Sequence, residues 1–273
     1  MMDFTPSPHA AFSDAFEAII DRAMEAANRA QSPRHYLGAS RLGEECERKL
    51  GYEYFHTPKD EGRNFKGSAL RIFDRGHDAE ARMAAYLRLA GFTVLTERPR
   101  GGQFGFAVAW DETTGVYRIS GHCDGVIIAG PDAMAYPALW EMKALGDKGW
   151  KDTVKRGVKV SKPVYYAQMQ LYMAYLGLTE NPGLFTALNG NDGKLYAELV
   201  PFDAQAAQAA SDRGVRVVSA MSADELPRIG RDSTDFRCKF CDFRQKCWHS
   251  QQSQSTTAAE SNEWWSNAHK NLP

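Results

Sequence analysis

Apolar residues recur at helical spacing through the first third of the chain. Their pattern predicts three helices, over residues 9–31, 40–55 and 66–92. Ser40 is the expected N-cap of the second helix, because its hydroxyl can accept a hydrogen bond from an unpaired backbone amide.

From residue 93 the period of the pattern falls to two, which is typical of strands. Turns rich in Gly and Pro separate four such segments, TVLTE, FGFAVAW, VYRISGHCDGVII and LWEMKAL. Helices are expected over residues 163–178 and about 203–221. Between them two strands, LFTAL and KLYAELVPF, are joined by the hairpin turn NGNDG. This order of elements predicts a mixed α/β core.

Composition places the chain among ordinary globular proteins and limits its partners. Of its 273 residues 43% are hydrophobic and 25% charged, and the formal net charge is −1, so nucleic-acid binding has to come from local basic patches. No segment reaches the length of a membrane span, and the N-terminus lacks the features of a signal peptide. We therefore expect a cytoplasmic protein with no membrane partner, whose five cysteines are thiols or metal ligands.

The strand LWEMKAL (139–145) carries two charged residues in an otherwise apolar run. Because side chains alternate along a strand, Glu141 and Lys143 point to one face and Trp140 and Met142 to the other. Such a pair is either a solvated surface feature or a functional site, and these seven residues alone leave both interpretations open.

A second carboxylate follows the preceding strand, at Asp124-Gly125. If the two strands are neighbours, Asp124 faces Glu141 across the pair. Two carboxylates and a lysine at strand ends suit a hard divalent cation with a nucleophilic water beside it. The alternative is that Asp124-Gly125 is ordinary turn chemistry.

Two of the predicted helices place polar residues among apolar ones. In the helix over 66–92, His77 and Glu80 share a face with Phe73, Ala84 and Leu87. If that face is buried, the two polar groups need a metal, a lysine, each other or a backbone carbonyl as partner. In the helix over 163–178 one face is shared by Gln168 and Tyr172 with Tyr165 and Tyr175, which suits either simple packing or recognition.

Four elements in this order resemble the PD-(D/E)xK nucleases: Gly76-His77, Gly121-x-x-Asp124, Glu141-x-Lys143 and Gln168-x-x-x-Tyr172. The resemblance covers roughly residues 40–248 and is closest to the RecB-like branch, which includes a CRISPR-associated iron–sulfur exonuclease, and to related phage exonucleases. It implies a restriction-endonuclease-like mixed sheet flanked by helices. One departure is that Gly76 directly precedes His77, whereas the family histidine follows its glycine by a few residues.

The resemblance also implies the roles of the site residues. Asp124, Glu141 and His77 are expected to hold Mg²⁺ or Mn²⁺, with Glu80 sharing the acidic role. Lys143 is expected to be catalytic, and the helix with Gln168 and Tyr172 to contact DNA. The expected activity is a metal-dependent deoxyribonuclease, most simply an exonuclease on single-stranded or frayed DNA, with protein partners in a recombination, repair or CRISPR-type complex. A structure-specific endonuclease and a DNA-binding subunit with a vestigial site are the alternatives.

Three cysteines lie close together near the C-terminus, Cys238, Cys241 and Cys247 in the spacing C-x2-C-x5-C, and Cys46 lies far upstream. Four thiolates can hold zinc or an iron–sulfur cluster, and the spacing does not separate the two. The resemblance favours a 4Fe-4S cluster, because related nucleases combine one early cysteine with three late ones. Cys123, next to Asp124, is expected to be a packed thiol outside this set.

The segment 147–162 carries six basic residues against two acidic ones, with Trp150 among them. We expect a flexible basic loop in which Lys151, Lys155 and Lys159 contact phosphates and Trp150 stacks on an unpaired base; a solvated connector is the alternative. The expected domains are a helical N-terminal region (1–65), a nuclease core (66–222), a cysteine segment (223–250) and a flexible tail (251–273).

Overall fold

The computed structural model describes residues 8–249. Contacts divide the chain into two compact units, one of residues up to Glu44 together with Phe65–Val218, the other of Glu45–Asn64 together with the chain from Ser219 on. The expected region 1–65 is thus shared between the units, and Cys46 belongs to the same unit as the C-terminal cysteines. The tail expected over 251–273 lies outside the described residues.

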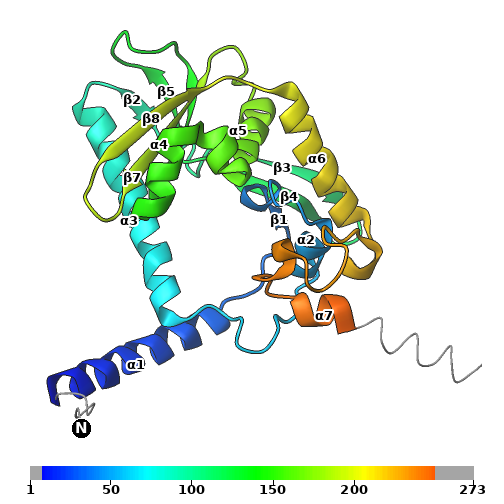
Figure 1. Cartoon of the computed structure of the whole chain (residues 1–273). Helices are drawn as coiled ribbons and strands as arrows, with labels where there is room; N and C mark the ends of the chain where they lie inside the picture. The colour runs from blue at the N-terminus through cyan, green and yellow to red at the C-terminus, as the bar shows by residue number, and fades with distance from the viewer. Residues whose placement is uncertain (1–7, 250–273) are drawn as a thin grey trace, which may run out of the picture. The chain divides into compact units, whose positions relative to one another are not determined.

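The first unit contains a five-stranded sheet in the order β2-β5-β6-β7-β8 (Figure 1). Its strands are β2 (Thr93–Leu95), β5 (Gly125–Ala129), β6 (Ala138–Leu145), β7 (Gly183–Asn189) and β8 (Leu195–Val200). Only the central pair β6 and β7 is parallel among the pairs of this sheet. The predicted turn NGNDG joins β7 to β8, which confirms that hairpin.

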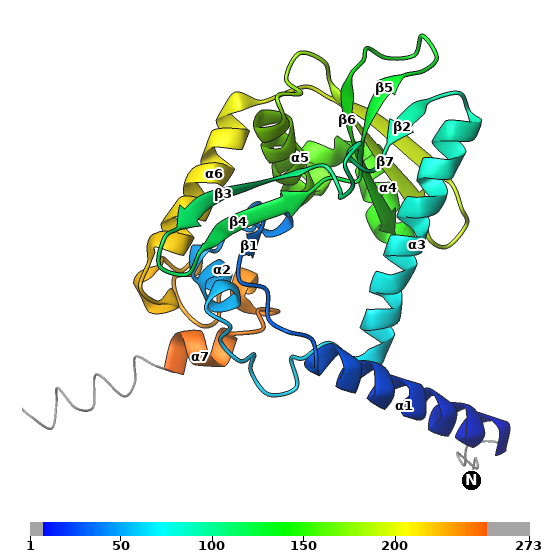
Figure 2. The ribbon, with the colours of Figure 1, turned by 180° about the vertical axis from the view of Figure 1, so that it is seen from behind.

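A three-stranded sheet in the order β1-β4-β3 completes the strands of this unit (Figure 2). It consists of β1 (Leu37–Gly38), β3 (Gly105–Asp111) and β4 (Val116–His122). The single strand expected over 116–128 is therefore wrong. The chain leaves this sheet after His122, passes Cys123 and Asp124, and enters the five-stranded sheet as β5. Alternation of apolar residues continues across the crossing, so the pattern alone does not reveal it.

Helices cover both faces of the five-stranded sheet, as expected for a restriction-endonuclease-like fold (Figure 1). α3 (Gly67–Leu89) lies on one face, where Ala79 and Met83 pack against Trp140 and Met142 of β6. α4 (Asp147–Ser161) and α5 (Pro163–Leu176) form the crossover from β6 to β7 and contact the sheet themselves. α5 begins with Pro163 and ends at Gly177, whose φ of 68° only glycine adopts freely. α6 (Ala204–Ser219) follows β8.

The segment 147–162 is the helix α4, so the expected flexible loop is wrong. Asp147 pairs with Lys151 (2.8 Å) and Asp152 with Arg156 (2.6 Å), both at the i,i+4 spacing that stabilises a helix. Gly157 interrupts the helix with a φ of 71°. Thr153 and Val158 are fully buried and fix one face of the segment, and Glu198 of β8 accepts a hydrogen bond from the Val158 amide (2.8 Å).

The helix expected over 40–55 is also corrected. A 3-10 helix spans Ala39–Arg41, and α2 (Glu47–Tyr54) begins only after Cys46, so Ser40 caps nothing. Gly43 lies between the two, so close to α5 that a Cβ atom there would stand 2.5 Å from the Cα atom of Val164. The tight approach of two backbones, which the pattern of apolar residues cannot predict, ends the first turn.

α1 (Pro8–Arg29) confirms the first predicted helix, but its apolar face is not buried within the described chain. Phe12 is 73% exposed and Phe16 56%. Acidic residues attach the helix to α3 instead: Arg71 bonds to Glu17 (2.6 Å) and to Asp21.

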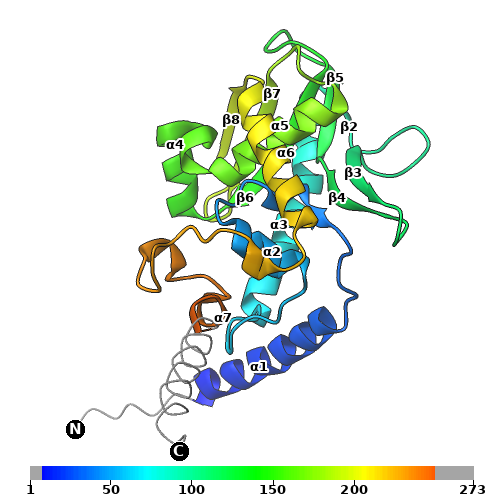
Figure 3. The same ribbon diagram turned by 90° about the vertical axis from the view of Figure 1, so that its right-hand side faces the viewer.

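The second unit is built around α2 and α7 (Arg244–His249), with 3-10 helices at Ala223–Glu225 and Phe236–Cys238 (Figure 3). Its core contains Tyr52, Ala223, Phe243 and Cys247. Asp60 accepts the backbone amides of residues 245 (2.6 Å) and 246 (3.3 Å) and so caps α7. Among the helices of residues 8–249, none is long and apolar enough to cross a membrane.

Candidate active site

Asp124 is positioned by the pairing of β5 with β6. Gly125 lies opposite Trp140 in this antiparallel pair, so the register brings Asp124, the residue before β5, to the level of Glu141 in β6. The Asp124 carboxylate accepts a hydrogen bond from the backbone amide of Met142, the residue after Glu141 (2.6 Å). The expected neighbourhood of the two strands is confirmed, and the carboxylate is held by a backbone group that no side-chain pattern reveals.

Glu141 and Lys143 lie on the face of β6 opposite Trp140 and Met142, as the alternation predicts. The Lys143 ammonium donates hydrogen bonds to Glu141 and to the carbonyl oxygen of Met142 (3.0 Å), and it lies 3.9 Å from the Asp124 carboxylate. Glu141 is completely buried and the Lys143 side chain is 21% exposed, so the pair is not a solvated surface pair. The Tyr165 ring, 5.3 Å from the Lys143 nitrogen, adds a cation–π contact that the sequence did not assign to the site.

Gln168 and Tyr172 of α5 lie against Glu141. The Gln168 amide donates to the Glu141 carboxylate (2.7 Å) and lies 3.3 Å from the Tyr172 hydroxyl. Both side chains are buried, so in this structure their contacts orient the carboxylate. One oxygen of Glu141 and the amide oxygen of Gln168 are buried without a hydrogen-bond partner in the described chain. An unpaired buried carboxylate oxygen is costly, which points to a ligand at this position.

Burial and mutual repulsion control the charges of the cluster. Burial, and next the negative charge of Asp124, raise the pKa of Glu141 to about 8, although Lys143 opposes the shift. Burial likewise raises the pKa of Asp124, against the lowering effect of Lys143. Burial disfavours the charged form of Lys143, but Glu141 and Asp124 outweigh it, so its pKa is raised and the ammonium is retained. Strongly perturbed groups that converge in this way are typical of functional sites.

α3 contributes Glu80 and, at the margin, His77. Burial and the nearby Asp124 raise the pKa of the half-buried Glu80 to about 7. His77 is exposed, and its charge lowers the pKa of Asp124, so it lies within electrostatic reach of the site. The face of α3 that carries His77 and Glu80 was expected to pack on the sheet, but at its N-terminal end Phe73 is exposed and packs against Phe65.

A divalent cation fits the donor set at this cluster. Asp124 and Glu141 supply carboxylate oxygens, and the unpaired oxygen of Glu141 leaves one of them open to a ligand. Within residues 8–249, however, no group of three or more His, Cys, Asp or Glu side chains is arranged to hold a metal ion. The fit therefore rests on the two carboxylates of the strands, with Glu80 and His77 nearby on α3.

The four cysteines expected to form a cluster all belong to the second unit and are free. Burial raises the pKa of the Cys241 thiol to about 11, and charges on Cys46 and Cys247 add to the shift. Burial also raises the pKa of Cys238, to which Cys46 and Cys247 again contribute. Cys46 and Cys247 therefore act electrostatically on both thiols, but within residues 8–249 no three of these cysteines are arranged to hold a metal ion. Cys123 belongs to the first unit, where burial raises its pKa to about 12.

The basic residues of α4 are partly engaged in ion pairs. Lys151 pairs with Asp147, and Lys159 pairs with Asp203 (3.0 Å), whereas Lys155 is exposed and forms no ion pair in the described chain. Trp150 is half-buried and its indole nitrogen is fully covered. This placement does not support the expected exposed ring for base stacking.

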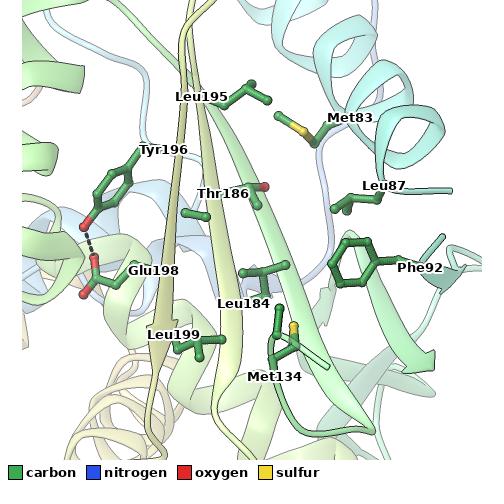
Figure 4. Close-up of a pocket in the computed structure, with 12 residues that line it drawn as sticks. Met83, Leu87, Phe92, Met134, Leu184, Thr186, Leu195, Tyr196, Glu198 and Leu199 are labelled. Carbon is green, nitrogen blue, oxygen red and sulfur yellow. Dashed lines mark hydrogen bonds between the residues drawn. The ribbon is translucent and has the colours of Figure 1, made fainter. Parts of the chain in front are cut away.

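An apolar recess of about 330 Å³ lies beside α3 (Figure 4), and its lining residues Met83 and Leu184 belong to the same cluster as Trp140 and Met142. Met83 and Leu87 of α3, Leu184 of β7, and Leu195 and Leu199 of β8 line it. Its lining also includes Thr186, Tyr196 and Glu198, and the Tyr196 hydroxyl donates to Glu198 (2.8 Å); none of the residues that line it belongs to the candidate active site.

Replacing Glu80 with glutamine is expected to stabilise the metal-free protein at pH 8 by on the order of 1–3 kcal/mol. Because folding raises the pKa of Glu80 from 4.5 to about 7, its contribution to stability is present below pH 4.5 and is lost as the pH rises to about 7. The gain should therefore be large at pH 8 and small at pH 5. Unfolding by urea in the presence of EDTA measures it, with the exposed Glu112→Gln as the control. An equal gain at both pH values would contradict the assignment.

The sequence matches no protein-family model, and no curated protein matches it. Among solved structures the chain is similar to one described as SSO0001, with a TM-score of 0.44 and 16% identity over 84% of this chain and 94% of that one. It is also similar to an alkaline exonuclease, LHK-Exo from Laribacter hongkongensis, with a TM-score of 0.42 and 18% identity over 72% and 92% of the two chains. For the same exonuclease in complex with dAMP, the TM-score is 0.42 and the identity 16%, over 72% of this chain and 90% of that one. Likenesses of this extent carry no argument about activity, so the function is inferred from the site.

Proposed function

We propose that the chain is a metal-dependent deoxyribonuclease of the RecB-like PD-(D/E)xK type, which acts as an exonuclease on single-stranded or frayed DNA. The observation that carries the proposal is the buried cluster of Asp124, Glu141 and Lys143 at the junction of β5 and β6, with one carboxylate oxygen left unpaired. An unpaired buried acceptor destabilises a fold, so a bound ligand at this oxygen would offset that cost.

Asp124 and Glu141 would hold Mg²⁺ or Mn²⁺, supported by Glu80 and His77. When bound, such an ion supplies Lewis-acid stabilisation of the phosphodiester and lowers the pKa of a water ligand. The ordered hydrogen bonds of Met142 and Gln168 to the two carboxylates fix these ligands in advance.

Lys143 is the catalytic residue of this proposal. Its ammonium is held by Glu141 and by the carbonyl oxygen of Met142, and it stays protonated because of the carboxylates around it. A fixed positive charge at this position orients the attacking water and stabilises the negative charge that develops on the phosphate. Tyr165 and Gln168 are positioning residues: one packs on the ammonium, and the other holds the carboxylate.

The DNA-binding residues of the proposal come from α4 and α5. Lys155 is an exposed cation available for a phosphate, and Lys151 and Lys159 can exchange their acidic partners for phosphates at low cost, because exposed ion pairs are weak. Gln168 and Tyr172 are buried, so in this structure they influence the reaction through Glu141, which Gln168 holds. They would contact DNA themselves only if both side chains became exposed. Trp150 packs within α4 with its indole nitrogen covered, so the proposal gives it a packing role in the helix that carries these lysines.

The four cysteines of the second unit form the other part of the proposal, a 4Fe-4S cluster with zinc as the alternative. Cys46, Cys238, Cys241 and Cys247 would supply four thiolates, which suit both groups. Binding would have to draw them together, because within residues 8–249 no three of them are arranged to hold a metal ion. The role proposed for the group is structural, because it would join the segment before α2 to the segment around α7.

Incubation with linear and with closed circular single-stranded DNA tests the activity. With Mg²⁺ or Mn²⁺ present, we expect linear strands to be degraded to short products and circles to survive, because an exonuclease needs an end. Cleavage of the circles would replace the proposal with an endonuclease. If both substrates are bound and neither is cut under any metal condition, the chain is a binding subunit, and the proposed activity is wrong.

A further inference from the structure

The turn over residues 236–240 (FRCKF), hereafter the aromatic turn, exposes two phenylalanines that the fold does not need. Phe236 is 81% exposed and Phe240 77%. Phe243, three residues later, is buried against Tyr52 with ring centroids 5.2 Å apart, so it provides the apolar contact of this segment with the core. Exposed phenylalanine rings forgo hydrophobic stabilisation, and two within one turn call for an explanation.

Each of these rings has a cation beside it. The Arg237 guanidinium carbon lies 6.0 Å from the Phe236 ring centroid, and the Lys239 nitrogen lies 5.7 Å from that of Phe240. Arg237 is held in place by both oxygens of Asp235 (2.7 and 3.0 Å). Lys239 is exposed and has no acidic partner in the part of the chain that the structure describes.

The alternation of rings and cations favours nucleic acid over a protein as the ligand of this surface. Lysine is depleted from the centres of protein interfaces, yet Lys239 stands between the two rings in the chain. Sites for single-stranded nucleic acid combine aromatic rings, on which bases stack, with cations that follow the phosphates. A phenylalanine has two faces, so a cation beside one of them leaves the other open to a base.

We propose that the aromatic turn is a binding site for single-stranded nucleic acid, in which Phe236 and Phe240 stack on unpaired bases and Lys239 contacts a phosphate. The inference rests on the proposed function, because the ligand is the DNA on which the nuclease acts, and it adds a second contact surface outside the candidate active site. Arg237 supports the Phe236 ring and is already neutralised by Asp235.

Fluorescence anisotropy of a labelled oligo(dT) strand tests the site on the full-length protein, without added divalent cations so that the DNA stays intact. The double variant Phe236→Ala/Phe240→Ala is expected to bind about tenfold or more weakly, with an unchanged dependence on salt. Phe236→Tyr/Phe240→Tyr should keep wild-type affinity, whereas Phe236→Leu/Phe240→Leu should not, because leucine keeps the apolar volume and loses the ring. Lys239→Ala should lower the slope of log affinity against log salt by about 0.7.

Phe12→Ala is the matched control, since Phe12 is 73% exposed on α1 and should be silent. Wild-type affinity of the alanine or the leucine double variant would overturn the inference, the second because it would show an apolar contact without stacking. If the wild-type protein cleaves the strand and the alanine double variant binds and cleaves it equally well, this inference alone fails. If the wild-type protein neither binds nor cleaves it, the proposed function fails as well.

Discussion

Lys143→Ala is expected to lower the rate of DNA cleavage by about 10²–10³-fold while the affinity for DNA stays close to that of the wild type. The Lys143 side chain is only 21% exposed and its ammonium lies beside Glu141 and Asp124, where it can act on the chemical step but offers little surface to the DNA backbone. Single-turnover cleavage of a linear strand measures the chemical step, and anisotropy without divalent cations measures binding.

The alanine also leaves two buried carboxylates without their counter-charge, so folding needs its own control. Unfolding should be monitored beside activity, and Lys143→Met offers a side chain of similar length without charge. Arg100→Ala, at an exposed position between β2 and β3, should retain turnover. Cleavage at the wild-type rate by a folded Lys143→Ala protein would remove Lys143 from the mechanism.

Loss of one thiol from the cysteine set is expected to have the largest effect on stability. Protein purified without oxygen should be brown and contain about four irons per chain. Cys241→Ser should lose that metal and unfold the second unit at lower temperature, because a site with three thiolates binds its metal more weakly and metal binding contributes to folding. Metal analysis and thermal unfolding followed by circular dichroism measure the two effects.

Cys123→Ala provides the matched control for a cysteine outside the set. Cys123 lies buried in the first unit, so its loss should leave the metal content unchanged. One zinc per chain in colourless protein would select the alternative metal. Full metal content in Cys241→Ser would show that Cys241 is not a ligand.

The elements that the sequence predicted well are those in which one periodicity dominates. β6 is such an element: strict alternation separates Glu141 and Lys143 from Trp140 and Met142, and the structure has the same two faces. α5 is another, where Pro163 and Gly177 mark both ends. Local signals of this kind act within a few residues and can therefore be recognised in a single chain.

The elements that the sequence predicted poorly depend on contacts with distant parts of the chain. α4 looked like a loop because its polar residues mask a short buried face, which only its packing and the bond to Glu198 make evident. The single strand expected over 116–128 is two strands in the structure, β4 and β5, because its halves pair in different sheets. Gln168 was expected to contact DNA, and its bond to Glu141 became apparent only with the spatial arrangement of α5 and β6.

The parallel pairing of β6 with β7 has a consequence for how this protein can change through evolution or engineering. Parallel neighbours need a crossover long enough to return the chain to the same edge, and here α4 and α5 form it. The crossover cannot be shortened to a hairpin loop without breaking the central strand pair, so new properties must arise there by exchange of residues. The turn over 112–115 joins the antiparallel strands β3 and β4, is exposed throughout and bears no such constraint, which makes it the more tolerant place for an inserted sequence.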